Sequence, residues 1–157
     1  MTITYRRATV EDLPALAGLR WEMEVERKDV RMEFDAMEFD AYERAYIAAV
    51  EADIARGTNV VWLALAEGAP VACVMLIWWQ LVPNFEEGNR KRGFVSSVYT
   101  RPAFRRQGIA RRLMGELVAF ARERGVHRLI LWASDMGRPL YEDLGFSASR
   151  GLELNLD

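Results

Sequence analysis

The chain has 157 residues, of which 51% are hydrophobic and 28% charged, the composition of an ordinary soluble globular protein. This length predicts one domain, residues 1–157, with a single sizeable core. The net charge of −2 argues against a nucleic-acid-binding protein, and no apolar run is long enough to span a membrane. Because the sequence also opens with no basic and apolar leader, we expect a cytoplasmic protein without a membrane segment.

The first third of the chain predicts one strand and two helices. Residues 3–7 alternate between apolar and polar side chains, which indicates a strand. A capping-box pattern that begins at Thr9 introduces a helix over about 13–27. A second helix is expected over 39–55, and Gly57 follows it as the residue type that most often ends a helix.

Two apolar runs, 59–66 and 71–79, predict a hairpin around the turn-forming residues 67–70. Their continuous apolar character favours strands that are covered on both faces. The single cysteine, Cys73, lies in the second run, where a buried and inert thiol is expected. Residues 81–92 contain proline, asparagine and glycine and are expected to form a loop.

The centre of the chain predicts a strand, a turn with glycine and a helix, in that order. Residues 94–100 are rich in β-branched and aromatic side chains, and Pro102 ends the strand. One apolar stripe then follows at helical spacing: Ile109, Leu113, Leu117 and Phe120. The first backbone N–H groups of this helix, near Gly108, have no partner within it and lie at the positive end of its dipole. Such a helix start is suited to bind phosphate.

Arginines surround this turn, and no acidic residue interrupts the segment from Arg101 to Gly115. The segment holds five of them: Arg101, Arg105, Arg106, Arg111 and Arg112. Guanidinium groups bind phosphate well, although a solvated helix face would explain Arg111 and Arg112 equally simply. Because Gly108 has no side chain, a diphosphate could approach the backbone closely. A dinucleotide-binding turn is disfavoured, since it requires three glycines where this loop has one.

The last part of the chain predicts a strand over 127–133 and a short helix over 137–144 that carries Tyr141. After Gly145 ends the helix, Phe146 is expected to re-enter the sheet, and alternating leucines predict a final edge strand at 152–156. The element order as a whole predicts an α/β fold in which a parallel strand pair flanks the phosphate-binding helix. A ligand would then bind at the carboxyl ends of those strands.

Two segments resemble a known family. Residues 105–110, RRQGIA, resemble the acyl-coenzyme A signature (R/Q)-x-x-G-x-(G/A) of the GCN5-related N-acetyltransferases (GNAT). Residues 140–146, LYEDLGF, resemble the family's L-Y-x-x-L-G-F. The resemblance is densest from Phe94 to Phe146. It implies a single-domain, GNAT-like mixed sheet flanked by helices, with a splayed parallel strand pair holding acyl-CoA.

The resemblance also implies site residues. Tyr141 would give a proton to the departing thiolate, and the Val98 N–H would polarise the thioester carbonyl. The residues expected to bind acetyl-CoA are Val98, Thr100, Arg105, Arg106, Gln107, Gly108, Ile109, Ala110, Arg111 and Asp135. Two alternatives stay open: Tyr141 could simply pack against Phe146, and Asp135 could cap the short helix, the interpretation that we favour.

The acceptor is less well defined. Between Trp21 and Ile54 there are eleven acidic and four basic residues, which favours a cationic amine acceptor, although a solvated helical face explains the same charges. Many family members carry a carboxylate on the central strand as general base, whereas Ser96 and Ser97 stand here. The remaining candidates for the base are Glu33, Glu86 and Glu87, or water. The single histidine, His127, is expected to be structural.

The sequence therefore predicts an enzyme that transfers acetyl from acetyl-CoA to a primary amine, on a small molecule or a peptide. The resemblance implies direct attack in a ternary complex, without a metal and without a covalent intermediate. The alternative is an acyl-CoA sensor or interaction module that lost turnover, because the strand carboxylate is missing. Homodimers are common in the resembled family, and we expect neither nucleic acid nor membrane as a partner.

Overall fold

The structure is a computed structural model, and it describes residues 1–27, 38–86, 88 and 90–157. Five strands form one sheet in the order β1-β2-β3-β4-β5, antiparallel except for the parallel pair β4 and β5. The strands are β1 (Ile3–Arg7), β2 (Asn59–Ala66), β3 (Ala69–Gln80), β4 (Lys91–Thr100) and β5 (Val126–Ile130). The helices are α1 (Leu13–Glu26), α2 (Phe39–Arg56), α3 (Ile109–Glu123) and α4 (Arg138–Asp143). This confirms the predicted α/β class with a mixed sheet.

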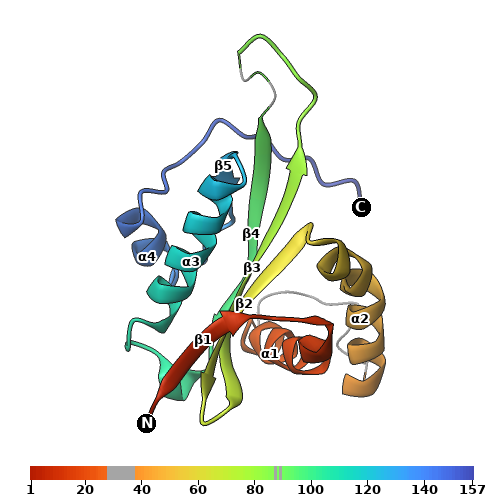
Figure 1. Cartoon of the computed structure of the whole chain (residues 1–157), viewed down its shortest axis with the longest axis vertical. Coiled ribbons are helices and arrows are strands. Elements are labelled where there is room, and N and C mark those ends of the chain that lie inside the picture. Colours follow the sequence, from red (N-terminus) through yellow and green to blue (C-terminus); the bar gives the residue numbers. More distant parts are fainter. Residues whose placement is uncertain (28–37, 87, 89) are drawn as a thin grey trace.

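Helices cover both faces of the sheet: α1 and α2 lie on one side, and α3 and α4 on the other (Figure 1). Strand β2 shows why its sequence is apolar throughout. Val61, Leu63 and Leu65 join the core beneath α1, while Trp62, Ala64 and Ala66 join the core beneath α3. Successive side chains of a strand point to opposite faces, so a strand between two helical layers must be apolar at every position. The expectation of strands covered on both faces is confirmed.

Both long helices next to the site follow their sequence signals. The stripe predicted for α3 is buried at every position, with Leu113 and Leu117 fully enclosed. Helix α2 ends at Gly57, which adopts the left-handed conformation (φ 77°) in which a residue with a Cβ would be strained. Helix α3 begins at Ile109, a short turn after β4 ends at Thr100, so its amino-terminal end follows the carboxyl end of that strand.

The parallel pair separates partway along β4. Its ladder runs from Lys91 opposite Val126 to Phe94 opposite Ile130, and β5 ends there, three residues short of the expected boundary. Strand β4 continues six residues further, to Thr100, paired only with β3. A bulge interrupts this pairing at Ser97, whose φ of 52° is unusual for a residue other than glycine. The sheet is therefore open on one side of β4 from Val95 onward.

The carboxyl-terminal segment differs from its expectation. Residues 145–157 form neither helix nor strand, so the final edge strand at 152–156 was wrongly predicted. Leucines 152, 154 and 156 are at least 80% exposed, because the alternating pattern has no strand beside it against which to pair. Phe146 does not re-enter the sheet; its ring instead packs edge-on against Tyr141, with the centroids 6.0 Å apart.

Candidate active site

A pocket of about 370 Å³ lies where β4 and β5 separate. Its walls come from five parts of the chain: the last turns of α1, residues Phe94 to Tyr99 of β4, Arg105 of the turn before α3, the segment that follows β5, and Tyr141 of α4. On the side of β4 where β5 no longer pairs with it, the backbone of β4 therefore faces a cavity. The sequence predicted this opening only through the family resemblance, because backbone groups leave no compositional signal.

Tyr141 is 8% exposed and lines this pocket. Burial raises the pKa of its phenol, while the positive charge of Arg27 acts in the opposite direction. The tyrosine also packs against Phe146, the contact that the alternative interpretation expected, while its role as proton donor stays a prediction. Gly137 makes room for the ring: a Cβ there would lie 2.9 Å from Cε2 of Tyr141. The sequence analysis missed this role of Gly137.

The bulge in β4 is held by two side chains that the sequence analysis did not single out for this role. The buried thiol of Cys73 donates to the Ser97 carbonyl oxygen at 3.3 Å, and the Arg20 guanidinium donates to Ser97 Oγ at 3.2 Å. Arg20 is itself ion-paired with Glu24. Val98 follows the bulge directly, so these contacts fix the orientation of the backbone at the predicted oxyanion position.

The turn before α3 has the geometry that its glycine suggested. Gly108 occupies the N-cap position with φ 77°, and no side chain caps the helix there. Arg106 also has a positive φ, of 63°, so two residues of this turn adopt the left-handed backbone conformation. Ile109 is buried in the core and can offer a ligand only its backbone, while the Gln107 amide donates to the Ala103 carbonyl at 3.4 Å.

Most arginines of the basic segment have carboxylate partners. Arg105 donates to Glu26 at 2.6 Å and to the Thr100 carbonyl at 2.8 Å, and it lines the pocket. The other three pairs are Arg101 with Glu22, Arg111 with Asp143 and Arg112 with Glu116. Among the described residues, Arg106 has no such partner. The patch is therefore less positive than its sequence suggests.

Glu26 is a pocket residue that the sequence analysis counted only as part of an acidic stretch. Its carboxylate accepts hydrogen bonds from the Tyr99 hydroxyl and from Arg105, each at 2.6 Å. Although burial acts to raise its pKa, these hydrogen bonds lower the pKa of Glu26 overall. The carboxylate is held as an anion and is a weak proton acceptor. No sequence signal marked it, because its partners lie more than 70 positions away.

Glu86, Asp135 and His127 do not line the pocket. Glu86 is exposed in the loop between β3 and β4, and Glu33 and Glu87 lie outside the described residues. The cap interpretation of Asp135 was wrong, because Ser134 Oγ accepts the Gly137 N–H at 3.1 Å while Asp135 is exposed. His127 begins β5, where a ring nitrogen lies 3.1 Å from the Lys91 carbonyl oxygen.

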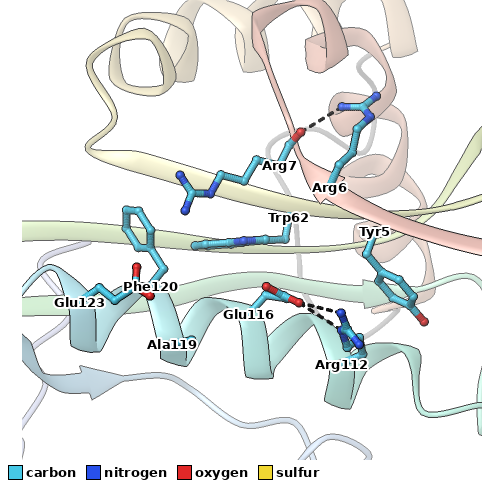
Figure 2. A pocket seen from close by; sticks show the side chains of 9 residues that line it. All are labelled: Tyr5, Arg6, Arg7, Trp62, Arg112, Glu116, Ala119, Phe120 and Glu123. Carbon is cyan, nitrogen blue, oxygen red and sulfur yellow. Dashed lines mark hydrogen bonds and ion pairs between the residues drawn. The ribbon is translucent and has the colours of Figure 1, made fainter.

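A second pocket, of about 210 Å³, lies between β1, β2 and α3, and Figure 2 shows its side chains. The Arg7 guanidinium lies over the ring of Phe120, 4.6 Å from its centroid, and Arg112 lies over Tyr5 while it pairs with Glu116. These contacts join the edge strand to α3. The pocket contains none of the predicted site residues.

Two searches of the described part of the chain gave no candidates. Within it, no helix has the length and apolar character needed to cross a membrane. No group of three or more His, Cys, Asp or Glu side chains there could hold a metal ion.

The fold and the pocket together define an α/β domain whose site lies in the gap between two diverging parallel strands. The chain belongs to the acetyltransferase (GNAT) family, whose sequence model matches residues 21–146. The family resemblance stated from residues 105–110 and 140–146 is thereby confirmed. Acetyltransferases of this family use acetyl-CoA.

Individual relatives agree. Glucosamine 6-phosphate N-acetyltransferase of Trypanosoma brucei brucei is 35% identical over 75 residues, 47% of this chain. The match spans about half (51%) of the length of that relative. A predicted acetyltransferase from Clostridium acetobutylicum, crystallised with acetyl-CoA, superimposes with a TM-score of 0.85 and 25% identity, covering 99% of this chain and 97% of its own. A GCN5-related N-acetyltransferase from Ralstonia eutropha JMP134 superimposes with a TM-score of 0.82 and 26% sequence identity, and the match covers 99% of each chain.

Proposed function

We propose that this chain is one catalytic domain, residues 1–157, that transfers acetyl from acetyl-CoA to a primary amine by direct attack in a ternary complex. One observation carries the proposal: a buried phenol, Tyr141, shares a pocket with the stretch of β4 that has no partner strand on its β5 side. The likeness to a structure crystallised with acetyl-CoA supports the same conclusion.

The residues around the pocket fit this cosubstrate. The uncapped N–H groups from Gln107 to Ala110, with Arg106, would hold the diphosphate, and the open space above Gly108 leaves them accessible. The backbone of Val98 and Thr100 would pair with the pantetheine arm on the open side of β4. Asp135 is exposed and does not line the pocket, and its contact with the cofactor arm stays a prediction.

The reaction needs two groups from the protein, the Val98 N–H and the Tyr141 hydroxyl. When bound, acetyl-CoA supplies an activated acyl carbon and a thiolate leaving group. The Val98 N–H stabilises the negative charge that develops on the carbonyl oxygen as the amine nitrogen attacks. Tyr141 protonates the sulfur as the carbon–sulfur bond breaks, and a proton from the attacking nitrogen restores the phenol. One further proton leaves the acceptor ammonium before attack, so the products are an amide, a thiol and a proton.

We propose that water carries away this first proton. Glu26 is the one acidic side chain among the described residues of the pocket, and its hydrogen bonds keep it a weak base. The acceptor then reacts as the fraction of free amine that is present at a given pH. Activity should rise with pH until that amine is fully deprotonated.

The proposal is tested by release of free thiol from acetyl-CoA in the presence of single amines. The panel should include glucosamine 6-phosphate, since a relative is named for acting on it. We expect thiol release that depends on one class of amine and acetylated product in equal amount. If acetyl-CoA binds, as measured by calorimetry, but no amine or peptide in the panel releases thiol, the result favours the sensor alternative.

A further inference from the structure

The charges that line the active-site pocket differ from those of the surrounding sequence. Arg20, Arg27 and Arg105 line it, against one described acid, Glu26. The acidic stretch from Trp21 onward predicted a cationic acceptor, but that prediction counted residues without regard to their partners. A bound acceptor would interact with the charged side chains that line the pocket, whatever the net charge of the surrounding sequence.

Two of the three arginines are already neutralised. Arg105 is paired with Glu26, and Arg20 is paired with Glu24 while it also donates to Ser97. The remaining nearby acid of α1, Glu22, is paired with Arg101. Arg27 has no carboxylate partner among the described residues. Counting the described residues alone, the pocket therefore carries one uncompensated positive charge.

The position of Arg27 relates this charge to the reacting groups. It follows the last residue of α1, where a cation also complements the helix dipole. Arg27 is exposed to solvent and also lines the pocket together with Tyr141. Its positive charge acts to lower the pKa of the Tyr141 phenol, in the pocket that both side chains line. A molecule whose amine reacts beside Tyr141 would have its other end within the field of Arg27.

We propose that the acceptor is an amine that also carries an anionic group, a carboxylate or a phosphate monoester, and that the Arg27 guanidinium binds this group. This inference rests on the proposed function, because it assigns the substrate class of the same site. A guanidinium presents parallel N–H donors that match either anion in a bidentate arrangement. Binding of a neutral or cationic amine would leave the charge of Arg27 unpaired.

The test compares matched amines with and without the anion. The pairs are O-phosphoethanolamine with ethanolamine, glucosamine 6-phosphate with glucosamine, and β-alanine with propylamine, with 1,3-diaminopropane as the cationic probe. We expect the anionic member of at least one pair to have the higher kcat/KM. In Arg27→Ala this preference should fall by about 10- to 100-fold, the usual worth of a charge-assisted hydrogen bond. Phosphate and carboxylate are distinguished by which pairs respond.

Three controls make the result specific. Arg44→Ala removes an exposed arginine of α2 that lies outside the pocket, so the preference should be unchanged. Arg27→Lys keeps the charge without the bidentate geometry and should give an intermediate preference. The KM for acetyl-CoA should change less than about twofold in Arg27→Ala, because the residue is assigned to the acceptor.

Three results would overturn the inference: a preference for neutral or cationic amines, a preference that survives Arg27→Ala, or an increase in the KM for acetyl-CoA alone. If no amine releases thiol, calorimetric titration with the same pairs in the presence of CoA decides the question. Tighter binding of the anionic members that is lost in Arg27→Ala would keep the anion site while the proposed acetyl transfer fails. Equal binding of both members would remove the inference as well.

Discussion

At the scale of single residues, burial controls the protonation state of groups in and near the site. Tyr141 is a buried residue of α4 whose ring packs against Phe146. Burial raises the pKa of its phenol above the ordinary value of about 10. The phenol therefore keeps its proton across the neutral and mildly alkaline range. A group that must donate a proton to a thiolate benefits from this, because no activity is lost to its own ionisation.

Replacing Tyr141 by phenylalanine removes the proton donor while keeping the ring that packs against Phe146. We expect kcat to fall on the order of 10²-fold, because general acid catalysis typically contributes 10²- to 10⁴-fold. Acetyl-CoA affinity by calorimetry and the thermal melting temperature should stay nearly unchanged. An equal loss of affinity would instead indicate that the tyrosine is only part of the binding surface.

The pH dependence follows from the same residue. Because the pKa of Tyr141 is raised, the protonated phenol is present below its folded-state pKa and is lost only above about pH 10. The kcat/KM for the acceptor should therefore rise with pH as the ammonium deprotonates, with no descending limb below about pH 10. A rate profile from pH 6 to 10 measures this, and a decrease near pH 8 would exclude Tyr141 as the acid.

The single cysteine gives a prediction about reactivity. Cys73 is buried and donates to the Ser97 carbonyl, and burial raises the pKa of its thiol to about 12. At pH 8 the native protein should not react with iodoacetamide or an aromatic disulfide, whereas the unfolded protein should take up one equivalent. Rapid labelling of the native protein would mean that the bulge in β4 opens readily.

At the scale of elements, the site forms because β4 extends beyond the end of β5 and because a glycine precedes α3. The ladder ends at Phe94 and Ile130, and the bulge at Ser97 turns the free backbone that follows. Both features, the longer β4 and the glycine before α3, are features of the backbone and not of a side chain that would contact the substrate. Changes to these elements should therefore affect cosubstrate binding more than the chemical step.

Replacing Gly108 by valine tests the start of α3. A β-branched residue at φ 77° is strained by about 1–2 kcal/mol, and its side chain would occupy the space left for the diphosphate. We expect calorimetry to show no acetyl-CoA binding and chemical denaturation to show a lower free energy of unfolding.

Gly115→Ala is the matched control in the same helix. Gly115 is exposed in the helix interior with open space around its Cβ position, so alanine should raise the free energy of unfolding by about 0.5–1 kcal/mol. Its acetyl-CoA affinity should equal that of the unchanged chain. Normal binding by Gly108→Val would contradict the role of this turn.

At the scale of the whole molecule, one sheet separates two cores, and the exposed residues 147–157 belong to neither. Leu117 of α3 is fully buried, whereas Leu152, Leu154 and Leu156 are exposed. Hydrophobic burial stabilises only residues that are removed from water. Leucines of identical chemistry should therefore differ widely in their effect on stability.

Leu117→Ala should lower the free energy of unfolding by about 2–5 kcal/mol, since it leaves a cavity beneath α3. Changing Leu152, Leu154 and Leu156 together to serine should alter it by less than about 0.5 kcal/mol per site. Urea denaturation of the three proteins, with their masses in solution by light scattering, measures both effects. A large loss from the triple change would show that the leucines are buried against some other surface.

Much of the architecture could be predicted because it follows from local signals. The periodicity of α3, the glycine after α2 and the apolar runs of β2 and β3 each predicted an element that the structure contains. The predicted edge strand at 152–156 failed for a physical reason: alternation makes a strand amphipathic but does not supply a neighbouring strand. Asp135 failed as a cap because Ser134, one residue earlier, reaches the Gly137 N–H.

The sequence by itself determined the family, because each of the two segments that carry the resemblance is continuous in the chain. Phosphate binding by the turn at Gly108 stays a prediction. The tertiary structure alone decided which charges the pocket presents. Glu26 pairs with Arg105 and Glu24 with Arg20, while no described carboxylate reaches Arg27. Charge counts along a sequence cannot give this result, because an ion pair cancels charge only where folding brings its two members into contact.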